Sequence, residues 1–246
     1  MKIITSRANS AVKDVCGLHT KKGRSLRQQF IAEGIRTLET ILSSGLKPVA
    51  LYVTQNLSIS NNFDRNKITF VTPEVMAKMS CSKTPSGCLG VFAQPLQKKT
   101  ELDSGLVLAG IADPGNMGTL IRSAAALNTK TVVVIEGADP WSPKVVQSSA
   151  GTIAATNILE LSWQELYAHK KELPLYALVV SGGIPIAQAP QKDALLVVGS
   201  EAHGIPTEWI ADCDESITIP MPGGTESLNA AVAGSIALYL MQSQSH

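Results

Sequence analysis

Apolar runs recur through the second half of the chain, separated by segments with helical spacing. The runs are GLVLAGIA (105–112), TVVVIEG (131–137), TNILELS (156–162), LYALVVSG (175–182), ALLVVGS (194–200) and SITIPM (216–221). Strands that are apolar on both faces are typical of parallel sheets covered by helices. The pattern predicts an α/β domain with a parallel sheet, whose ligands bind at the carboxyl ends of the strands.

The first 95 residues alternate helix and strand patterns in shorter pieces. The pattern predicts a helix within 9–29 that passes into a basic stretch, strands at 30–34, 49–55 and 87–94, and helices at 35–45 and 72–80. The polar segment AQPLQKKTELDSG (93–105) then separates this part from the apolar runs. We predict a small α/β domain over 1–95, a linker over 96–105 and a second domain over 106–246.

Composition narrows the protein class. A chain of 246 residues with 44 % apolar residues can bury the cores of two modest domains. No apolar run approaches the roughly 18 residues needed to span a bilayer, and MKIITSRANS lacks the apolar core of a signal peptide. Four scattered cysteines without a C-x-x-C pair predict free thiols, a cytoplasmic location and no metal site.

The net charge of +1 hides a strong asymmetry. Residues 1–99 hold 15 Lys and Arg against 5 Asp and Glu, whereas residues 100–246 hold 6 against 15. A basic half favours a polyanionic partner such as RNA, although a solvated basic surface is the alternative. The candidates for RNA contact are Lys21, Lys22, Arg24 and Arg27; in the alternative they lie in a solvated loop.

The stretch DPGNMGTLIRSAAAL (113–127) follows the first long apolar run. Gly115 and Gly118 allow close backbone approach, and the helix that follows offers N–H groups to an anion. Arg122 is expected in the first turn of that helix, where its planar fork suits a phosphate or carboxylate. The stretch lacks both the Gly-Lys-Ser/Thr and the G-x-G-x-x-G nucleotide motifs. A simple turn with an arginine that pairs with an acid is the alternative.

Two further loops follow apolar runs. GSEAHGIP (199–206) carries Glu201, an acid or base candidate that we interpret first as a loop anchor. MPGGTESLN (221–229) leads into a helix and carries Ser227 and Asn229, which either cap that helix or reach a ligand. The helix has an apolar stripe at i+4 spacing that is either core or a dimer face. If the strand ends cluster, one site holds Asn116, Arg122, Glu201, Ser227 and Asn229.

Three segments resemble the ordered motifs of the SpoU (TrmH-like) ribose 2′-O-methyltransferases of the SPOUT superfamily. They are NMGTLIRSAAAL, LLVVGSEAHGIP and ITIPMPGGTESLNAAVAGSIALYL, within residues 105–242. The opening SRANSAVKDVCGL and the later KKGRSLRQQFIAEGIRTLETIL are similar to the substrate-binding domain of that family. The resemblance implies a C-terminal SPOUT domain with a deep trefoil knot, one of the rare knotted folds. It also implies an N-terminal domain like a small ribosomal RNA-binding protein.

The same resemblance implies an activity. It is the methylation of a ribose 2′-hydroxyl in RNA from S-adenosylmethionine, by a homodimer paired through the C-terminal domain, with ribosomal RNA favoured over transfer RNA. The cofactor positions fall on Gly199, Ile219, Met221 and Leu228, and the catalytic positions on Arg122, Asn116, Glu201, Ser227 and Asn229.

The reaction requires the ribose hydroxyl to lose its proton as it attacks the methyl carbon. Free arginine stays protonated at neutral pH and is a poor base there. Either the site makes Arg122 give up its proton, or Arg122 binds the flanking phosphate and stabilises the developing alkoxide. Two rival functions are a non-catalytic RNA-binding protein and an enzyme that acts on a small phosphorylated molecule.

Overall fold

The computed structural model describes residues 3–60, 62–97, 102–129, 131–189, 193–224 and 227–243 of the chain. The chain forms two compact units, one of Met1–Leu96 with Trp141–Ala155 and the other of Gln97–Pro140 with Thr156–His246. Residues 98–101 of the predicted linker lie outside the described residues. Within the described ranges, none of the helices has the length and apolar character that crossing a bilayer demands.

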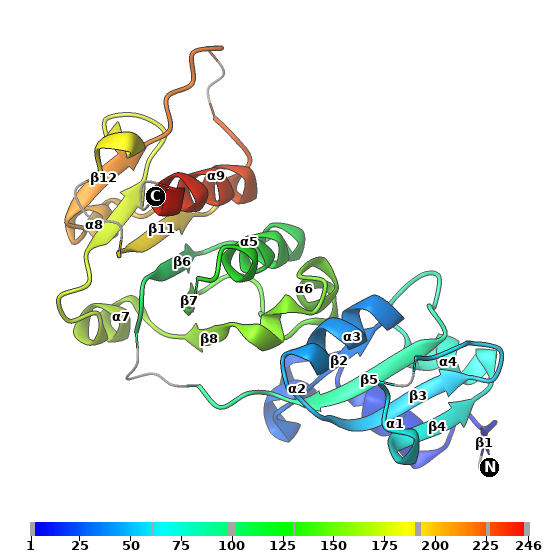
Figure 1. The fold of residues 1–246 in the computed structure, drawn as a ribbon. Helices are drawn as coiled ribbons and strands as arrows, with labels where there is room; N and C mark the ends of the chain where they lie inside the picture. Colours follow the sequence, from blue (N-terminus) through cyan, green and yellow to red (C-terminus); the bar gives the residue numbers. More distant parts are fainter. Residues whose placement is uncertain are drawn as a thin grey trace. The chain divides into compact units, whose positions relative to one another are not determined.

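The first unit contains a mixed five-stranded sheet with the order β1-β4-β3-β5-β2 (Figure 1). Its strands are β1 (Ile3–Ile4), β2 (Gln29–Glu33), β3 (Pro48–Thr54), β4 (Ile68–Val71) and β5 (Cys88–Ala93). Its helices are α1 (Ser10–Gly17), α2 (Lys21–Arg27), α3 (Ile35–Ser43), η1 (Arg65–Lys67), α4 (Pro73–Met79), α6 (Pro143–Ser148) and η2 (Thr152–Ala155).

The two faces of this sheet are covered differently. On one face, Val12 and Val15 of α1 and Val75 and Met76 of α4 form a buried cluster with Ile31 of β2 and other strand residues. On the other face lies α3, where Leu38 packs so close to Gly90 that a Cβ there would come within 2.7 Å of its Cδ2. The period of two along each strand divides the apolar residues between these two cores.

The segment Trp141–Ala155 belongs to the first unit although it lies between β7 and β8 in the sequence. Trp141 is 3 % exposed, and its ring packs on that of Phe30 with the centroids 5.0 Å apart. Gly151 approaches α3 so closely that a Cβ there would lie 2.5 Å from the Thr37 carbonyl oxygen. The compact units therefore divide differently from the predicted ranges 1–95 and 106–246. The assignment of those ranges to RNA binding and catalysis stays a prediction.

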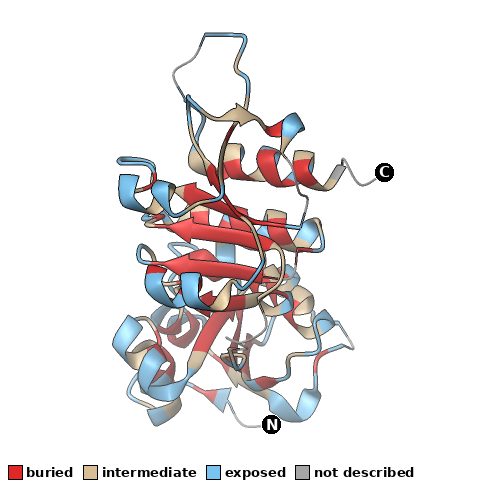
Figure 2. Ribbon diagram, turned by 90° about the vertical axis from the view of Figure 1, so that its left-hand side faces the viewer, coloured by how far each residue is buried: buried red, intermediate tan, exposed pale blue. Residues whose placement is uncertain are grey.

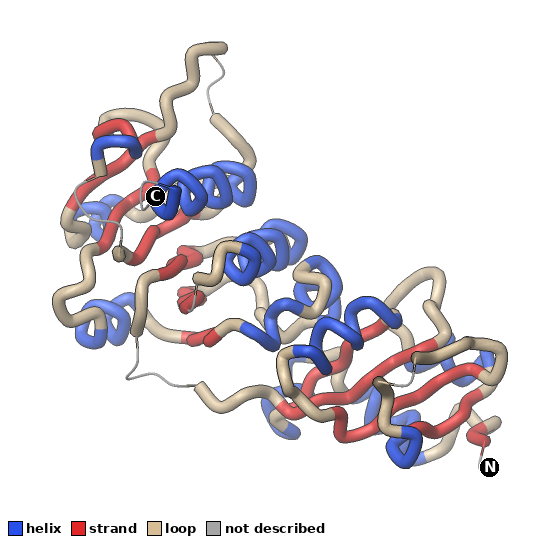
Figure 3. Tube along the Cα trace, in the orientation of Figure 1, coloured by secondary structure: helices blue, strands red, loops and turns tan. Residues whose placement is uncertain are grey.

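The second unit contains a seven-stranded sheet with the order β10-β12-β9-β11-β6-β7-β8, and every pair in it is parallel. Figure 3 colours the strands red and the helices blue. Its strands are β6 (Gly105–Ala109), β7 (Thr131–Ile135), β8 (Asn157–Glu160), β9 (Leu175–Leu178), β10 (Ile184–Pro185), β11 (Leu195–Gly199) and β12 (Glu215–Thr218). Its helices are α5 (Pro114–Ala126), α7 (Trp163–His169), η3 (Ile186–Gln188), α8 (Thr207–Ala211) and α9 (Ala230–Ser243).

The predicted parallel α/β fold is confirmed by this sheet. Each of β6 and β7 is buried over its full length, as the apolar runs require (Figure 2). Val107, Val133, Leu159 and Val197 meet in a single buried core. The trefoil knot that the resemblance implies stays a prediction.

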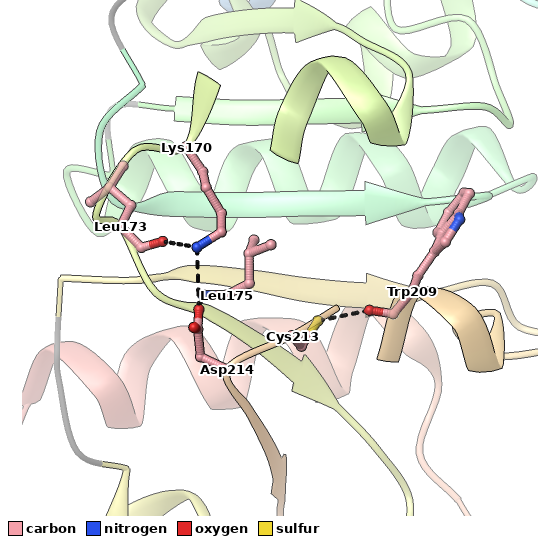
Figure 4. Close-up of polar contacts among 6 residues, drawn as sticks. All are labelled: Lys170, Leu173, Leu175, Trp209, Cys213 and Asp214. Atoms are coloured by element: carbon pink, nitrogen blue, oxygen red, sulfur yellow. Dashed lines mark hydrogen bonds and ion pairs between the residues drawn. The ribbon is translucent and has the colours of Figure 1, made fainter. Parts of the chain in front are cut away.

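One carboxylate is bonded to the amino-terminal end of β9. Asp214 Oδ2 accepts a hydrogen bond from the Leu175 N–H at 2.8 Å and one from Lys170 Nζ at 3.4 Å, and Lys170 also donates to the Leu173 carbonyl (Figure 4). Next to it, Cys213 donates to the Trp209 carbonyl (Figure 4). Burial, aided by the charges of Asp214 and Asp212, raises the pKa of the Cys213 thiol to about 12, so it packs as a neutral thiol.

Replacing Asp214 tests this anchor. Asp214→Ala leaves the Leu175 N–H without its side-chain acceptor, and we expect the free energy of unfolding to fall by about 1–3 kcal/mol. Asp214→Asn keeps an acceptor and loses an ion pair whose carboxylate is half-exposed, so its expected loss is under about 1 kcal/mol. Urea unfolding of both variants measures the difference, and equal losses would contradict the role of the N–H acceptor.

Candidate functional site

A cavity of about 470 Å³ opens among the loops that follow the carboxyl ends of β9, β11 and β12. This is the edge of a parallel α/β sheet where ligands bind. The residues assigned to cofactor binding by resemblance all line it: Gly199, Ile219, Met221 and Leu228. Leu178, Val180 and Thr218 also line it, and sequence reasoning did not single them out. The sequence feature that could have identified these three residues is their position at the ends of the apolar runs that form β9 and β12.

Gly199 forms the wall of this cavity at the end of β11. A tight turn follows it, in which the Ser200 and Gly204 N–H groups donate to each other's carbonyl oxygens at 3.1 and 2.9 Å. A Cβ on Gly199 would lie 2.3 Å from the Gly204 carbonyl carbon and 2.5 Å from the Ile205 nitrogen. Because both neighbours are backbone atoms, the turn closes over the strand end only when residue 199 is glycine.

The side chains of Asn116, in the first turn of α5, Glu201, in the turn after β11, and Asn229, just before α9, meet at the cavity. Asn116 Nδ2 donates to Glu201 Oε1 at 2.7 Å, and Asn229 Nδ2 donates to Asn116 Oδ1 at 3.1 Å. These contacts join residues 85 and 113 positions apart in the chain. The carboxylate accepts only, so it fixes which end of the Asn116 amide points toward it.

Asn229 also begins the last helix of the chain. Its Oδ1 accepts from the N–H groups of Ala231 and Val232 at 2.9 and 3.2 Å. The capping interpretation is confirmed for Asn229, whose side-chain nitrogen also contacts Asn116. Its contact with a ligand stays a prediction. Glu201, Ser227 and Asn229 all line the cavity.

The structure places Arg122 differently from the sequence prediction. Helix α5 begins at Pro114, because Asp113 caps it by accepting from the Asn116 N–H at 2.8 Å and proline fits the first position. Arg122 is consequently the ninth helical residue, about 12 Å along the axis from the helix start. Its expected place in the first turn is wrong. The side chain is exposed, and it is absent from the described residues that line the cavity.

The four basic candidates for RNA contact divide into two pairs. Arg24 is 4 % exposed, and its Nη1 donates to the Leu18 carbonyl at 2.7 Å. Arg27 forms an ion pair of 2.9 Å with Asp14. Lys21 and Lys22 are exposed at the start of α2. In this structure the two arginines hold the α1–α2 corner together, and the two lysines face solvent.

Comparison with known families shows which family the chain belongs to. The profile of the SpoU rRNA Methylase family matches residues 104–239. The chain belongs to this family. A second profile, the MRM3-like substrate binding domain, matches residues 9–90. Both units thus have counterparts within one group of RNA-modifying proteins.

Full-length relatives support the same assignment. The chain is 28 % identical to the 23S rRNA (guanosine(2553)-2′-O)-methyltransferase RlmP of Bacillus subtilis, over 97 % of this chain and 98 % of the relative. A solved RNA 2′-O ribose methyltransferase superposes with a TM-score of 0.80 at 27 % identity, covering 99 % of both chains. An AdoMet-bound rRNA methyltransferase from Sinorhizobium meliloti shares the fold, with a TM-score of 0.87 at 24 % identity over 99 % of this chain and 98 % of that one.

Substitution of Gly199 tests whether the turn after β11 shapes the cavity. In Gly199→Ala the added Cβ must push the 200–204 turn away from the strand end. We expect the affinity for S-adenosylmethionine to fall by at least about tenfold, measured by isothermal titration calorimetry. The matched control is Gly223→Ala, where an added Cβ meets nothing within 4 Å. Wild-type affinity in Gly199→Ala would contradict the role of this glycine.

Proposed function

We propose that this protein transfers a methyl group from S-adenosylmethionine to a ribose 2′-hydroxyl of RNA. The observation that supports this best is the network of Asn116, Glu201 and Asn229 at the cavity lined by Gly199. It joins the three sequence motifs of the SpoU family at the carboxyl edge of the sheet. Ribosomal RNA is the proposed substrate class, because the relative RlmP acts on 23S rRNA.

The cavity fits the proposed cofactor in size and lining. A volume of about 470 Å³ lies in the range of small-molecule sites. Leu178, Ile219 and Leu228 offer apolar surface to an adenine ring, and Glu201 offers a carboxylate to a cationic group. Because Gly199 has no side chain, the backbone of Gly204 and Ile205 packs against it, and backbone atoms can lie close to a bound nucleoside. When bound, S-adenosylmethionine supplies an electrophilic methyl group on a sulfonium.

The chain's own residues would bind and orient the reacting groups. Asn116 is fixed by Glu201 on one side and Asn229 on the other, so the three loops keep one geometry. Ser227 lines the cavity and offers a hydroxyl that can donate or accept. Arg122 would bind the phosphate beside the target ribose and stabilise charge on the 2′-oxygen.

A homodimer through the second unit forms part of the proposal. Helix α9 exposes Val232 by 46 %, Ile236 by 37 % and Tyr239 by 58 %, and Leu228 just before it is 38 % exposed. Such a row of large apolar side chains on one helix face is typical of an interface that a second copy covers. Because Arg122 does not line the cavity of its own chain, we propose that the dimer brings it to the site of the other subunit.

The first unit would hold the RNA. Its profile match is to a substrate-binding domain, and Lys21 and Lys22 are exposed for phosphate contact. Arg24 is buried with its guanidinium on the Leu18 carbonyl and does not face the RNA in this proposal, whereas Arg27 pairs with Asp14 at the surface, where a phosphate can compete for it. The proposed compartment is the cytoplasm, consistent with four free cysteines.

The activity is tested with tritiated S-adenosylmethionine and bulk ribosomal or transfer RNA from a strain that lacks this protein. We expect alkali-resistant label in ribosomal RNA. Arg122→Ala should lower the rate by about 100-fold or more, the loss expected when a donor to developing charge is removed. Arg122→Lys keeps the positive charge but loses the planar guanidinium fork, so its rate of methyl transfer should also be low. Near-normal activity in Arg122→Lys would contradict the required guanidinium.

Other outcomes identify the rival functions. Label in transfer RNA alone would replace the proposed substrate class. Cofactor binding without transfer to any RNA, including assembling ribosomal particles, would favour a non-catalytic RNA-binding protein. Activity on small phosphorylated molecules without RNA affinity would favour an enzyme whose substrate is such a molecule.

Mixing two inactive variants tests the shared site. Asn116→Ala and Arg122→Ala each remove one component. If the arginine acts across the dimer, a random mixture should recover about a quarter of wild-type activity, because half of the dimers are mixed and each has one intact site. Sites made from one chain predict no recovery. Val232→Glu with Ile236→Glu should yield a monomer by analytical ultracentrifugation and remove the recovery.

A further inference from the structure

The first unit contains a second cavity, of about 330 Å³, that the proposed catalytic site does not use. Its wall comes from the end of β2, the loop before β5 and the exposed side of α6. All of these segments belong to the first unit, and α6 packs against β2 (Figure 1). The cavity is smaller than the cofactor site, and its volume suits a single nucleotide.

Glu33 is the charged acceptor of this cavity. Its Oε2 accepts from the Ser80 hydroxyl at 2.7 Å, and its Oε1 accepts from the Ser86 N–H at 2.9 Å. Two donors on two oxygens hold the carboxylate in one orientation. Each oxygen still has a free lone pair for a ligand N–H, because a carboxylate can accept about four hydrogen bonds.

The loop 80–86, which donates these bonds to Glu33, is also held by hydrogen bonds among its own residues. The Ser82 N–H donates to Ser80 Oγ at 2.9 Å, and Ser82 Oγ donates to the Thr84 carbonyl at 3.0 Å. Lys83 is exposed between two lining residues, Ser82 and Thr84. The loop therefore presents hydroxyl groups to the cavity and a cation to its outside.

Helix α6 completes the cavity with three residues of different chemistry. Pro143 offers an apolar ring, Gln147 an amide that both donates and accepts, and Lys144 an ammonium group. Lys144 and Gln147 are exposed, so both are available to a ligand. An apolar surface for a ring, polar groups for its edge and cations for a phosphate are the elements by which proteins hold an unstacked RNA base.

We propose that this cavity binds one unpaired nucleotide of the RNA substrate and selects a base that carries an amino group. Adenine, cytosine and guanine can each donate an N–H to Glu33, whereas uracil has no amino group and flanks its one N–H with carbonyl oxygens. Lys83 and Lys144 would neutralise the adjoining phosphates. The inference deepens the proposed RNA methyltransferase function by giving the substrate-binding unit a base-selective subsite.

A cysteine at the cavity provides a local probe. Cys81 lines the cavity and is the exposed one among the four free cysteines. Partial burial, reinforced by the charge of Glu33, raises the pKa of its thiol, so alkylation is best followed at mildly alkaline pH. A nucleotide in the cavity would cover this thiol, so protection from alkylation reports binding at the cavity, and the cavity-filling variant below separates it from binding beside it.

The experiment measures N-ethylmaleimide labelling of Cys81 by mass spectrometry in the full chain, with the hexanucleotides rA6, rC6 or rU6. We expect rA6 and rC6 to slow labelling about tenfold more effectively than rU6, the discrimination of one good base contact. Glu33→Gln should abolish the difference between the hexamers. Gln147→Trp fills the cavity from α6 and should abolish protection by rA6.

The controls separate this inference from the catalytic proposal. Lys47→Ala removes an exposed lysine of the same unit that does not line the cavity, and it should leave protection unchanged. The urea unfolding curve of Gln147→Trp should match that of the wild type, which excludes misfolding of the first unit as the cause. Equal protection by all three hexamers overturns the base selectivity, and no protection by any hexamer or by ribosomal RNA overturns the subsite. Protection without methyl transfer leaves the subsite standing and removes the catalytic proposal.

Discussion

The parallel pairing of β6 with β11 is the constraint on which the candidate active site depends. Their register sets Gly199 opposite Ala109, so the two strands end at the same level. The loop that leads to Asn116 and the turn that carries Glu201 both leave from there, and the two side chains meet at 2.7 Å. A shift of one residue would turn the wrong faces toward the core and separate the loops.

The sheet fixes the positions of the site residues more than the hydrogen bonds among their side chains do. Glu201 and Asn229 are exposed, and a hydrogen bond of this kind contributes only about 0.5–1.5 kcal/mol. The strands beneath are buried in a continuous apolar core and hold the loop ends in place. The network therefore selects one orientation of the side chains on a scaffold that is already rigid, as pre-organised sites require.

The sequence predicted the elements whose residues are buried, and it failed where a local signal had two meanings. The apolar runs at 105–112, 131–137 and 194–200 contain β6, β7 and β11, because both faces of those strands are covered. Strand β4 (Ile68–Val71) was not predicted, because only Val71 among its four residues is buried and the strand leaves no long apolar run in the sequence. The glycines after Asp113 were interpreted as a turn, whereas Pro114 and the aspartate cap begin the helix there.

For the candidate site residues, the sequence predicted which residues gather but not how they contact one another. The positions of Asn116, Glu201 and Asn229 were predicted as a group because each follows a buried strand, but their contacts depend on strand register, which periodicity does not give. The burial of Arg24 was not predicted, because a basic run contains no sign of which residue turns inward. Nor does spacing indicate that Trp141–Ala155 packs with the first unit, since its apolar residues fit either core.

Because the segment Trp141–Ala155 packs with the first unit, neither unit is one continuous stretch of the chain. The chain passes between the two units three times, after residues 96, 140 and 155. Cutting at residue 96 would separate the second unit from most of the first but leave Trp141, Val145, Val146 and Ile153 without the surface that now buries them. Modular exchange of the first unit during evolution must therefore alter two places in the gene at once, the amino-terminal part and a short insert between two strands of the sheet in the second unit.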